Sequence, residues 1–239
     1  MTRVLALDAA TEACSVALLC DGEVWERSVE AGRDHAQRLI TMVAELMAET
    51  EVSWSMLDGI AASIGPGAFT GVRISVAVAQ GLAFGAGLPV AAVSTLEALA
   101  LQVLKGEPGR AVACLDARMG EVYWGCFAAD AALGLIAAGP PGVGPPDSVS
   151  LPASLSWAGA DSGQPVRGIG RGFSAYPTLA ARLGVEIDEP RSRALPNARE
   201  IARLGALRLK LGLGLDPAEL QPLYLRDKVA LTEAERAAK

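Results

Sequence analysis

The chain has 239 residues, of which 51% are hydrophobic and 20% are charged, and its formal net charge is −6. This length suits one large domain or two small ones with a sizeable core, and the composition excludes a disordered chain, a disulfide scaffold and a collagen-like fibre. The net negative charge argues against a protein that binds nucleic acid with its whole surface.

The first half of the chain predicts three strands in a meander, followed by alternating helices and strands. Asp21-Gly22 is a hairpin turn signal, and residues 65–71 form a glycine-rich turn between a strand and a helix. We expect strands over 3–8, 14–20, 23–29, 57–64 and 89–93, helices over 35–50 and 72–86, and a helix capped by Ser94. This order is typical of the α/β ribonuclease-H-like fold of the actin-like ATPases, the ASKHA fold.

The second half of the chain predicts a smaller unit of the same kind. Residues 106–109 are typical of a hinge, and residues 111–116 form a strand that ends in Asp116, as the first strand ends in Asp8. The other expected elements are a strand over 121–128, loops with short strands over 130–165, and helices over 173–183 and 197–211. We expect a first lobe over 1–105, a reduced second lobe over 106–195, and a segment 196–239 that returns to the first lobe.

Three features predict a cytoplasmic protein. The cysteines lie in apolar, strand-like runs without a CxxC pair, as expected of free thiols in a reducing compartment: Cys14, Cys20, Cys114 and Cys126. Residues 2–8 lead straight into a strand pattern, so we expect no signal peptide. The uncharged stretch 74–96 is long enough to cross a bilayer, but Pro89 lacks an N–H. We therefore expect a buried helix, a turn and a buried strand there, and no membrane span.

Hydrolase and metal chemistry find little support in the sequence. Residues 61–65 loosely resemble a nucleophile elbow around Ser63, but the only histidine, His35, precedes this serine, whereas the hydrolase fold places it afterwards. One histidine and scattered cysteines also cannot supply a good zinc cage. We expect neither a catalytic triad nor a metal site.

Phosphate binding is the more serious candidate. Asp8 and Thr11 lie where the first phosphate loop of this fold would be, but Ala10 stands where nucleotide-using relatives have glycine, and its methyl group obstructs phosphate. A second candidate is the glycine turn, with Gly65, Gly67 and Gly71 in front of a helix N-terminus. These glycines could equally serve only to fold a tight turn. A third glycine loop, 168–172, is weak alone.

Several motifs together resemble the TsaB (YeaZ) family over nearly the whole chain. They are LALDAATEACSVAL (5–18), HAQRL (35–39), GPGAFTGVRI (65–74), AQGLA (79–83), VSTLEAL (93–99), DARMGEVYW (116–124) and PLYLRDKV (222–229). Ala68 and Ser75 replace a usual serine and a usual glycine, and both changes keep a small residue.

The resemblance implies a bacterial protein that is needed to form N6-threonylcarbamoyladenosine (t6A) in tRNAs that read ANN codons. It implies pairing with the catalytic subunit TsaD and with the small ATPase TsaE, a homodimer when alone, and contact with tRNA only through the complex. No intrinsic cofactor is implied, although ATP or ADP could bind at the complex junction. Where TsaD-like proteins carry a metal-binding His-x-x-x-His pair, this chain has Thr95 and Leu99. We therefore expect a non-catalytic subunit without protease activity.

The expected partner surface lies on two helices. Ala77, Gly81 and Gly85 recur every four residues, and small side chains let helices approach closely. We place the pairing surface on this helix and on the helix 35–50, which carries His35, Leu39 and Val43.

Two alternatives remain open from the sequence. One is an active small-molecule kinase or ATPase of the same fold, which would use Asp8, Thr11 and the glycine turn. The other is direct tRNA binding through residues 167–210, which carry nine basic and four acidic side chains. A solvated protein face explains the same basic residues.

Overall fold

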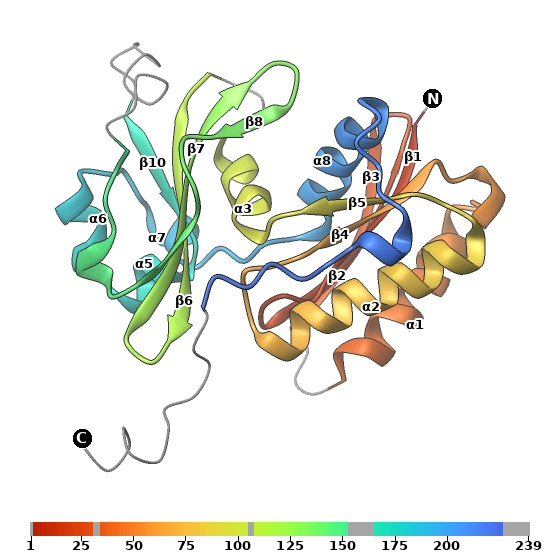
Figure 1. Ribbon diagram of the computed structural model, residues 1–239, viewed down its shortest axis with the longest axis horizontal. Coiled ribbons are helices and arrows are strands. Elements are labelled where there is room, and N and C mark those ends of the chain that lie inside the picture. The colour runs from red at the N-terminus through yellow and green to blue at the C-terminus, as the bar shows by residue number, and fades with distance from the viewer. Residues whose placement is uncertain (1, 31–33, 105–107, 153–164, 227–239) are drawn as a thin grey trace.

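The computed structural model describes residues 2–30, 34–104, 108–152 and 165–226, and it contains two β-sheets that helices cover (Figure 1). The first sheet has the order β3-β2-β1-β4-β5. Its strands are β1 (Arg3–Asp8), β2 (Ala13–Cys20), β3 (Glu23–Glu30), β4 (Gly59–Ser63) and β5 (Val90–Val93). β1 runs antiparallel to β2 and parallel to β4, so it lies at the centre of the sheet.

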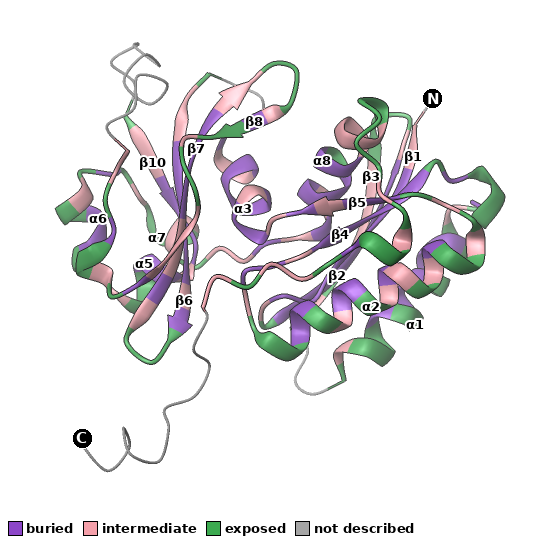
Figure 2. Ribbon diagram, in the orientation of Figure 1, coloured by how far each residue is buried: buried purple, intermediate pink, exposed green. Residues whose placement is uncertain are grey.

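Helices cover both faces of the first sheet, which explains why β1 reads as a continuous apolar run. Leu5 and Leu7 face the helices α1 (His35–Glu49) and α2 (Phe69–Ala86), whereas Val4 and Ala6 face α8 (Ala198–Lys210). Successive side chains of a strand point to opposite faces, so both sets are buried. Figure 2 shows β1, β2 and β4 buried, whereas the outer faces of α1 and α2 are exposed.

The second sheet repeats the arrangement around β1 in reduced form. Its order is β10-β6-β7-β8, and β9 also pairs with β7. The strands are β6 (Arg110–Arg118), β7 (Glu121–Asp130), β8 (Gly134–Ala137), β9 (Gly142–Gly144) and β10 (Val166–Ile169). β6 runs antiparallel to β7 and parallel to β10, as β1 does with β2 and β4. The expected two-lobed α/β ASKHA fold with a reduced second lobe is confirmed.

Two helices lie between the sheets and join them into one core. α3 (Thr95–Leu104) packs against β6 and β7 and also contacts α8, which covers the first sheet. Leu99 of α3 and Ile201 of α8 are fully buried in the same apolar cluster. The outer face of the second sheet is covered by the short helices α5 (Arg171–Ala175), α6 (Thr178–Leu183) and α7 (Glu189–Ser192).

The residues after α8 form an extended segment, here called the C-terminal strap (215–226). Leu215 pairs with Val90 at the edge of the first sheet, and the 3-10 turn η3 (Pro217–Glu219) follows. The amide of Leu223 donates to the carbonyl of Ile64 at 2.7 Å, and the Arg226 guanidinium pairs with Glu121 on β7. The strap therefore ties the first lobe to the second.

The structure differs from the predicted elements in places that local sequence explains. The helix expected over 173–183 is two helices, because Tyr176-Pro177 breaks it. The strand expected from residue 57 begins at Gly59, after the 3-10 turn η1 (Trp54–Met56), and the helix expected from residue 72 begins at Phe69. The loop region 130–165 contains β8, β9 and the turn η2 (Pro146–Ser148).

Some predictions fall on residues that the structure does not describe. These are residues 106–107 of the expected hinge, residues 153–164 of the loop region and residues 227–239 of the C-terminal segment. The division of the chain at residues 105 and 195 stays a prediction.

The uncharged stretch 74–96 forms most of α2, then β5 and the start of α3. Among the described residues, α2 is the one helix long and apolar enough to span a membrane by length and composition, with a mean hydropathy of 1.3. It packs against β1, β4 and α1, so one face of this helix covers the first sheet.

Candidate functional site

The two loops that were candidates for phosphate binding, the loop after β1 and the glycine turn 65–71, pack against each other. The Ala68 N–H donates to the Ala10 carbonyl at 2.7 Å. A Cβ at Gly67 would stand 2.1 Å from the Ala10 oxygen, and one at Gly71 would stand 2.0 Å from the Ala9 oxygen. These two glycines are thus required for close backbone packing. Gly65, with a φ of +100°, makes the turn before them.

Asp8 is fully buried beneath these loops. Its Oδ1 accepts hydrogen bonds from the Ala10 N–H at 3.0 Å and from the Ser63 hydroxyl, whose oxygen lies 3.1 Å from that of Ser75. Burial raises the pKa of this carboxyl, and the hydrogen bonds only partly oppose the rise. The Ala13 N–H donates to the hydroxyl oxygen of Thr11 at 3.4 Å. Asp8 therefore organises the loop from within the core.

The third glycine loop repeats this packing in the second lobe. It connects β10 to α5, and Gly170 has a φ of +107°. A Cβ at Gly170 would stand 2.2 Å from the carbonyl oxygen of Cys114 on β6. In both lobes, therefore, a glycine lies against a backbone carbonyl, which belongs to the loop after the central strand β1 in the first lobe and to the middle of β6 in the second.

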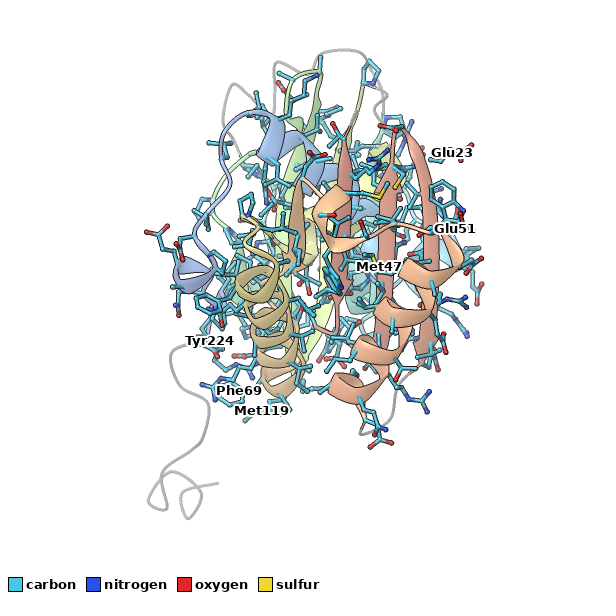
Figure 3. All side chains as sticks on the ribbon, turned by 90° about the vertical axis from the view of Figure 1, so that its right-hand side faces the viewer. Glu23, Met47, Glu51, Phe69, Met119 and Tyr224 are labelled. Carbon is cyan, nitrogen blue, oxygen red and sulfur yellow. The ribbon has the colours of Figure 1, made fainter. Side chains whose placement is uncertain are left out.

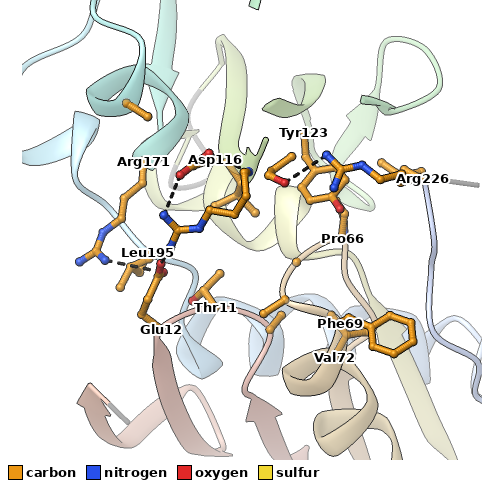
Figure 4. Close-up of a pocket in the computed structure, with 18 of the residues that line it drawn as sticks. Thr11, Glu12, Pro66, Phe69, Val72, Asp116, Tyr123, Arg171, Leu195 and Arg226 are labelled. Atoms are coloured by element: carbon orange, nitrogen blue, oxygen red, sulfur yellow. Dashed lines mark hydrogen bonds and ion pairs between the residues drawn. The ribbon is translucent and has the colours of Figure 1, made fainter. Parts of the chain in front are cut away.

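A cavity of about 820 Å³ lies between the lobes (Figure 4). The first lobe contributes the loop 10–12, His35 and the N-terminal end of α2, and the second lobe contributes the β6–β7 hairpin and α5. Leu195, residues 66–68 of the glycine turn and Leu223–Arg226 of the strap complete the lining. Thr11 lines this cavity, but Asp8 does not, because Ala9 and Ala10 cover it.

Ion pairs cross the cavity from one lobe to the other. Glu12 lies 2.6 Å from Arg118 of the β6–β7 hairpin and 3.6 Å from Arg171 of α5. Arg171 also contacts Glu30 at 3.2 Å. The sequence patterns did not single out these side chains, because they come from distant segments.

The expected partner surface is partly corrected by the structure. Ala77, Gly81 and Gly85 lie exposed along α2, but Leu39 and Val43 are buried against the sheet. Helical periodicity identified Leu39 and Val43 as one apolar face, and that face packs inward. The exposed apolar residues of α1 are instead Ala36, Ile40, Ala44 and Ala48.

α1 and α2 lie side by side on the outer face of the first sheet (Figure 3). Besides Phe69 at the start of α2, which is 45% exposed, two large apolar side chains project from them: Ile40 is 54% exposed and Phe84 is 83% exposed. Sequence reasoning missed both, although Phe84 lies one residue before Gly85. His35 is half-buried and lines the cavity, and its Nε2 atom has no hydrogen-bond partner among the described residues.

The positions that match a metal-binding pair are in the core. Thr95 and Leu99 are both fully buried at the start of α3. Within the described ranges, no group of three or more His, Cys, Asp or Glu side chains could hold a metal ion.

Comparison with known proteins identifies the family. Residues 29–140 match the family model "TsaD: tRNA N6-adenosine threonylcarbamoyltransferase". The chain is 36% identical over 229 residues to the tRNA threonylcarbamoyladenosine biosynthesis protein TsaB of Escherichia coli, covering 95% of this chain and 96% of that protein. It is 46% identical over 122 residues to the protein of the same name from Haemophilus influenzae, covering 51% and 52% of the two chains.

A solved structure agrees with these relatives. YeaZ from Pseudomonas aeruginosa superimposes with a TM-score of 0.81 at 38% identity, covering 94% of this chain and all of that one. The similarity to E. coli TsaB extends over nearly the full length of both chains. The chain therefore belongs to the TsaB (YeaZ) family of tRNA threonylcarbamoyladenosine biosynthesis proteins.

Proposed function

We propose that this chain is a non-catalytic subunit for the formation of t6A in tRNAs that read ANN codons, and that it pairs with a TsaD-type catalytic subunit and with TsaE. Membership of the TsaB family supports a role in t6A biosynthesis. The observation that carries the non-catalytic role is the contact of Gly67 with the Ala10 carbonyl. The Ala68 and Ala10 N–H groups donate to the Ala10 carbonyl and to Asp8, so neither is free to bind a phosphate.

The exposed faces of α1 and α2 support pairing through these helices. Small residues on α2 allow a partner helix to approach, and Phe84 offers a large apolar side chain at the end of the same face. Ile40 extends the apolar area onto α1. The same surface serves either a homodimer or the TsaD partner, and any ATP or ADP binds at the junction of the complex. The protein acts in the cytoplasm.

The contacts of the basic region support indirect rather than direct tRNA contact. Each arginine of residues 167–210 has a protein partner: Arg167, Arg171, Arg182, Arg191, Arg193, Arg199, Arg203 and Arg208. For example, Arg208 pairs with Glu97 and also donates to the Ala92 carbonyl. Six of them pair with carboxylates, which lowers the net positive charge offered to phosphates, so tRNA is reached through the complex.

Two residues that the kinase or ATPase alternative would need, Asp8 and Gly67, are engaged in the packing of the protein itself. Asp8 is shielded from the cavity, and burial favours its neutral form. Gly67 is committed to backbone packing. We therefore favour the accessory role.

Reconstitution of the modification reaction tests the proposal. The other purified components of the pathway, with tRNA, threonine, bicarbonate and ATP, should form t6A only when this chain is present. Gly81→Arg should abolish both copurification with TsaD and stimulation of t6A formation, because it places a long charged side chain on the pairing face.

The matched control is Gly139→Arg, since Gly139 lies exposed in the second lobe and a Cβ there, as at Gly81, meets no atom within 4 Å. This variant should pair and stimulate normally. Equal t6A formation with and without the wild-type chain would overturn the accessory role. Normal pairing of Gly81→Arg would overturn the assigned surface alone.

A further inference from the structure

The C-terminal strap (215–226) has side-chain contacts at both ends that the proposed function does not use. One end is fixed on α2 of the first lobe, and the other is fixed on the β6–β7 hairpin of the second lobe. We propose that the strap couples the pairing face on α2 to the second lobe, so that a partner docked on α2 also holds the β6–β7 hairpin in place. This coupling rests on the proposed function, because it regulates the same pairing face.

A stack of three side chains fixes Tyr224 of the strap at the start of α2. The Arg73 Nε atom donates to the Tyr224 hydroxyl at 2.6 Å, and the Arg73 Cζ atom lies 3.7 Å from the centroid of the Phe69 ring. The centroids of the Phe69 and Tyr224 rings are 5.7 Å apart, and the two side chains lie together at one end of α2 (Figure 3). Tyr224 is 46% exposed, so a protein docked on α2 can cover the stack.

The residues of α2 that hold the strap belong to the pairing face. Arg73 lies four positions before Ala77, and Gln80, which donates to two carbonyls of the strap, lies next to Gly81 and four positions before Phe84. Residues three and four positions apart lie on the same face of a helix, so these side chains form one stripe. The axes of packed helices are about 8–10 Å apart. A partner helix on this stripe therefore meets the strap at its border.

Arg226 holds both strands of the β6–β7 hairpin beside its turn. Its guanidinium pairs with Glu121 of β7 and donates to the Ala117 carbonyl of β6 at 3.1 Å. It also lies over the Tyr123 ring, 6.0 Å from the centroid (Figure 4). The side chains of Arg226 and Glu121 are 19% and 33% exposed, so water and salt screen this ion pair less than a pair on the open surface.

The chain between these two attachments is too short to let them move independently. Leu225 alone separates Tyr224 from Arg226, and an extended chain spans at most about 3.6 Å per residue. The Leu223 N–H is also bonded to the Ile64 carbonyl at 2.7 Å. Loss of the Tyr224 stack therefore loosens Arg226, and loss of the Arg226 ion pair loosens Tyr224.

The strap thus has a held state and a released state, and the two states differ in the surface that a partner meets. In the held state the Tyr224 ring is fixed beside the stripe of α2 and adds to the docking area. A partner that covers Tyr224 binds the held state more tightly and shifts the equilibrium towards it. Because such coupling is reciprocal, a change that releases Arg226 in the second lobe weakens pairing on the first.

Hydrogen exchange on the full chain without a partner tests the link itself. Tyr224→Ala should speed exchange at residues 117–124 by about threefold or more, because the strap then opens locally and stops bracing the hairpin. Leu211→Ala is the matched control, since Leu211 is 49% exposed and lies outside the strap. Unchanged exchange in Tyr224→Ala would overturn the coupling, and so would an equal rise in Leu211→Ala.

Titration calorimetry with the purified TsaD-type subunit tests the regulation. Glu121→Gln keeps the shape of the side chain and removes the charge that holds Arg226, in the lobe that does not carry α2. It should weaken pairing by about fivefold or more. Asp147→Asn, which removes an exposed carboxylate from the same lobe, is the control and should pair as the wild type does.

The two possible failures are distinguishable. Pairing of Glu121→Gln with the affinity of the wild type would overturn the coupling alone. A wild-type chain that does not pair with the TsaD-type subunit would overturn the proposed function, and the coupling with it. Thermal unfolding of each variant establishes that it is folded.

Discussion

Gly67 lies so close to Ala10 that a Cβ at position 67 would stand 2.1 Å from the Ala10 carbonyl oxygen. The same oxygen accepts a hydrogen bond of 2.7 Å from the Ala68 N–H. A side chain has no room here, and the oxygen cannot move away without breaking that bond. The glycine turn therefore joins two loops, a role that was not among the two inferred from its sequence, phosphate binding and a tight turn.

Gly67→Ala should destabilise the fold by about 1–3 kcal/mol or more, because the methyl group meets backbone rather than a flexible side chain. Gly71→Ala should behave alike, since its Cβ would stand 2.0 Å from the Ala9 oxygen. Urea unfolding of the purified proteins measures the loss. Gly139→Ala, where a Cβ meets no atom within 4 Å, is the control. A Gly67→Ala protein as stable as this control would contradict the packing role.

Gly81→Ala should stabilise the isolated chain by roughly 0.5–1 kcal/mol, because alanine favours the helix interior and its Cβ enters open space. The thermal midpoint of the isolated chain should rise accordingly. This result would establish that position 81 tolerates a side chain, so that loss of pairing by Gly81→Arg reflects the surface. A fall in the midpoint would mean that the glycine is needed for the fold itself.

The sequence predicted the helices and strands best where a regular pattern of apolar residues continued through the whole element. β1, α1 and α2 lie within a few residues of their expected ranges, and the resemblance of the motifs to TsaB led to the correct family. β10 was missed, because its glycine at position 168 was assigned to a loop. The single helix expected over 173–183 is interrupted at Pro177. A proline disfavours the helical conformation of the residue before it, and the period of the apolar residues does not report this effect.

The candidate site was less predictable, because it depends on contacts between distant segments. Leu39 shows the limit on one helix: its apolar periodicity marks a face but does not say whether that face meets the sheet or a partner. Glu12 and Arg118 are 106 positions apart, and no local pattern links them. The role of the glycine turn likewise became clear only when the Ala10 carbonyl was located against it.

Asp8 should make folding stability depend on pH. Burial raises its pKa above the usual value of 3.8, so the folded state binds this proton more tightly than the unfolded chain does. Its contribution is most favourable below the unfolded pKa and is lost as the pH rises through the raised value.

Asp8→Asn removes this titration and still accepts the hydrogen bonds from Ser63 and Ala10 through its amide oxygen. We expect a shallower fall in stability as the pH rises from about 4, although the Asn NH2 group takes the place of Oδ2, which is buried without a hydrogen-bond partner among the described residues, and so lowers the stability at every pH. Urea unfolding at several pH values measures the slope, and exposed Asp147→Asn is the control. An unchanged slope in Asp8→Asn would contradict the raised pKa.

Gln80 should hold the C-terminal strap on α2. Its Nε2 donates to the carbonyls of Pro217 at 3.0 Å and Leu220 at 3.1 Å. Gln80→Ala should cost about 1–2 kcal/mol of unfolding free energy and speed hydrogen exchange at the Leu223 amide, which donates to Ile64. Exposed Gln37→Ala on α1 is the control. Unchanged exchange at Leu223 would mean that other strap contacts suffice.

Cys20 should be the first thiol to react with a disulfide reagent such as DTNB, because it is half-buried while Cys14, Cys114 and Cys126 are buried. Burial raises the pKa of Cys14 and of Cys126 to about 11 and that of Cys114 still further, so few of these thiols are in the reactive thiolate form. The native chain should thus show one faster phase, followed by slow phases limited by opening of the sheets. Cys20→Ser should remove the faster phase, and guanidinium should make the remaining thiols react together. Persistence of the faster phase in Cys20→Ser would place an accessible thiol inside one of the two sheets and contradict the packing described for β2, β6 and β7.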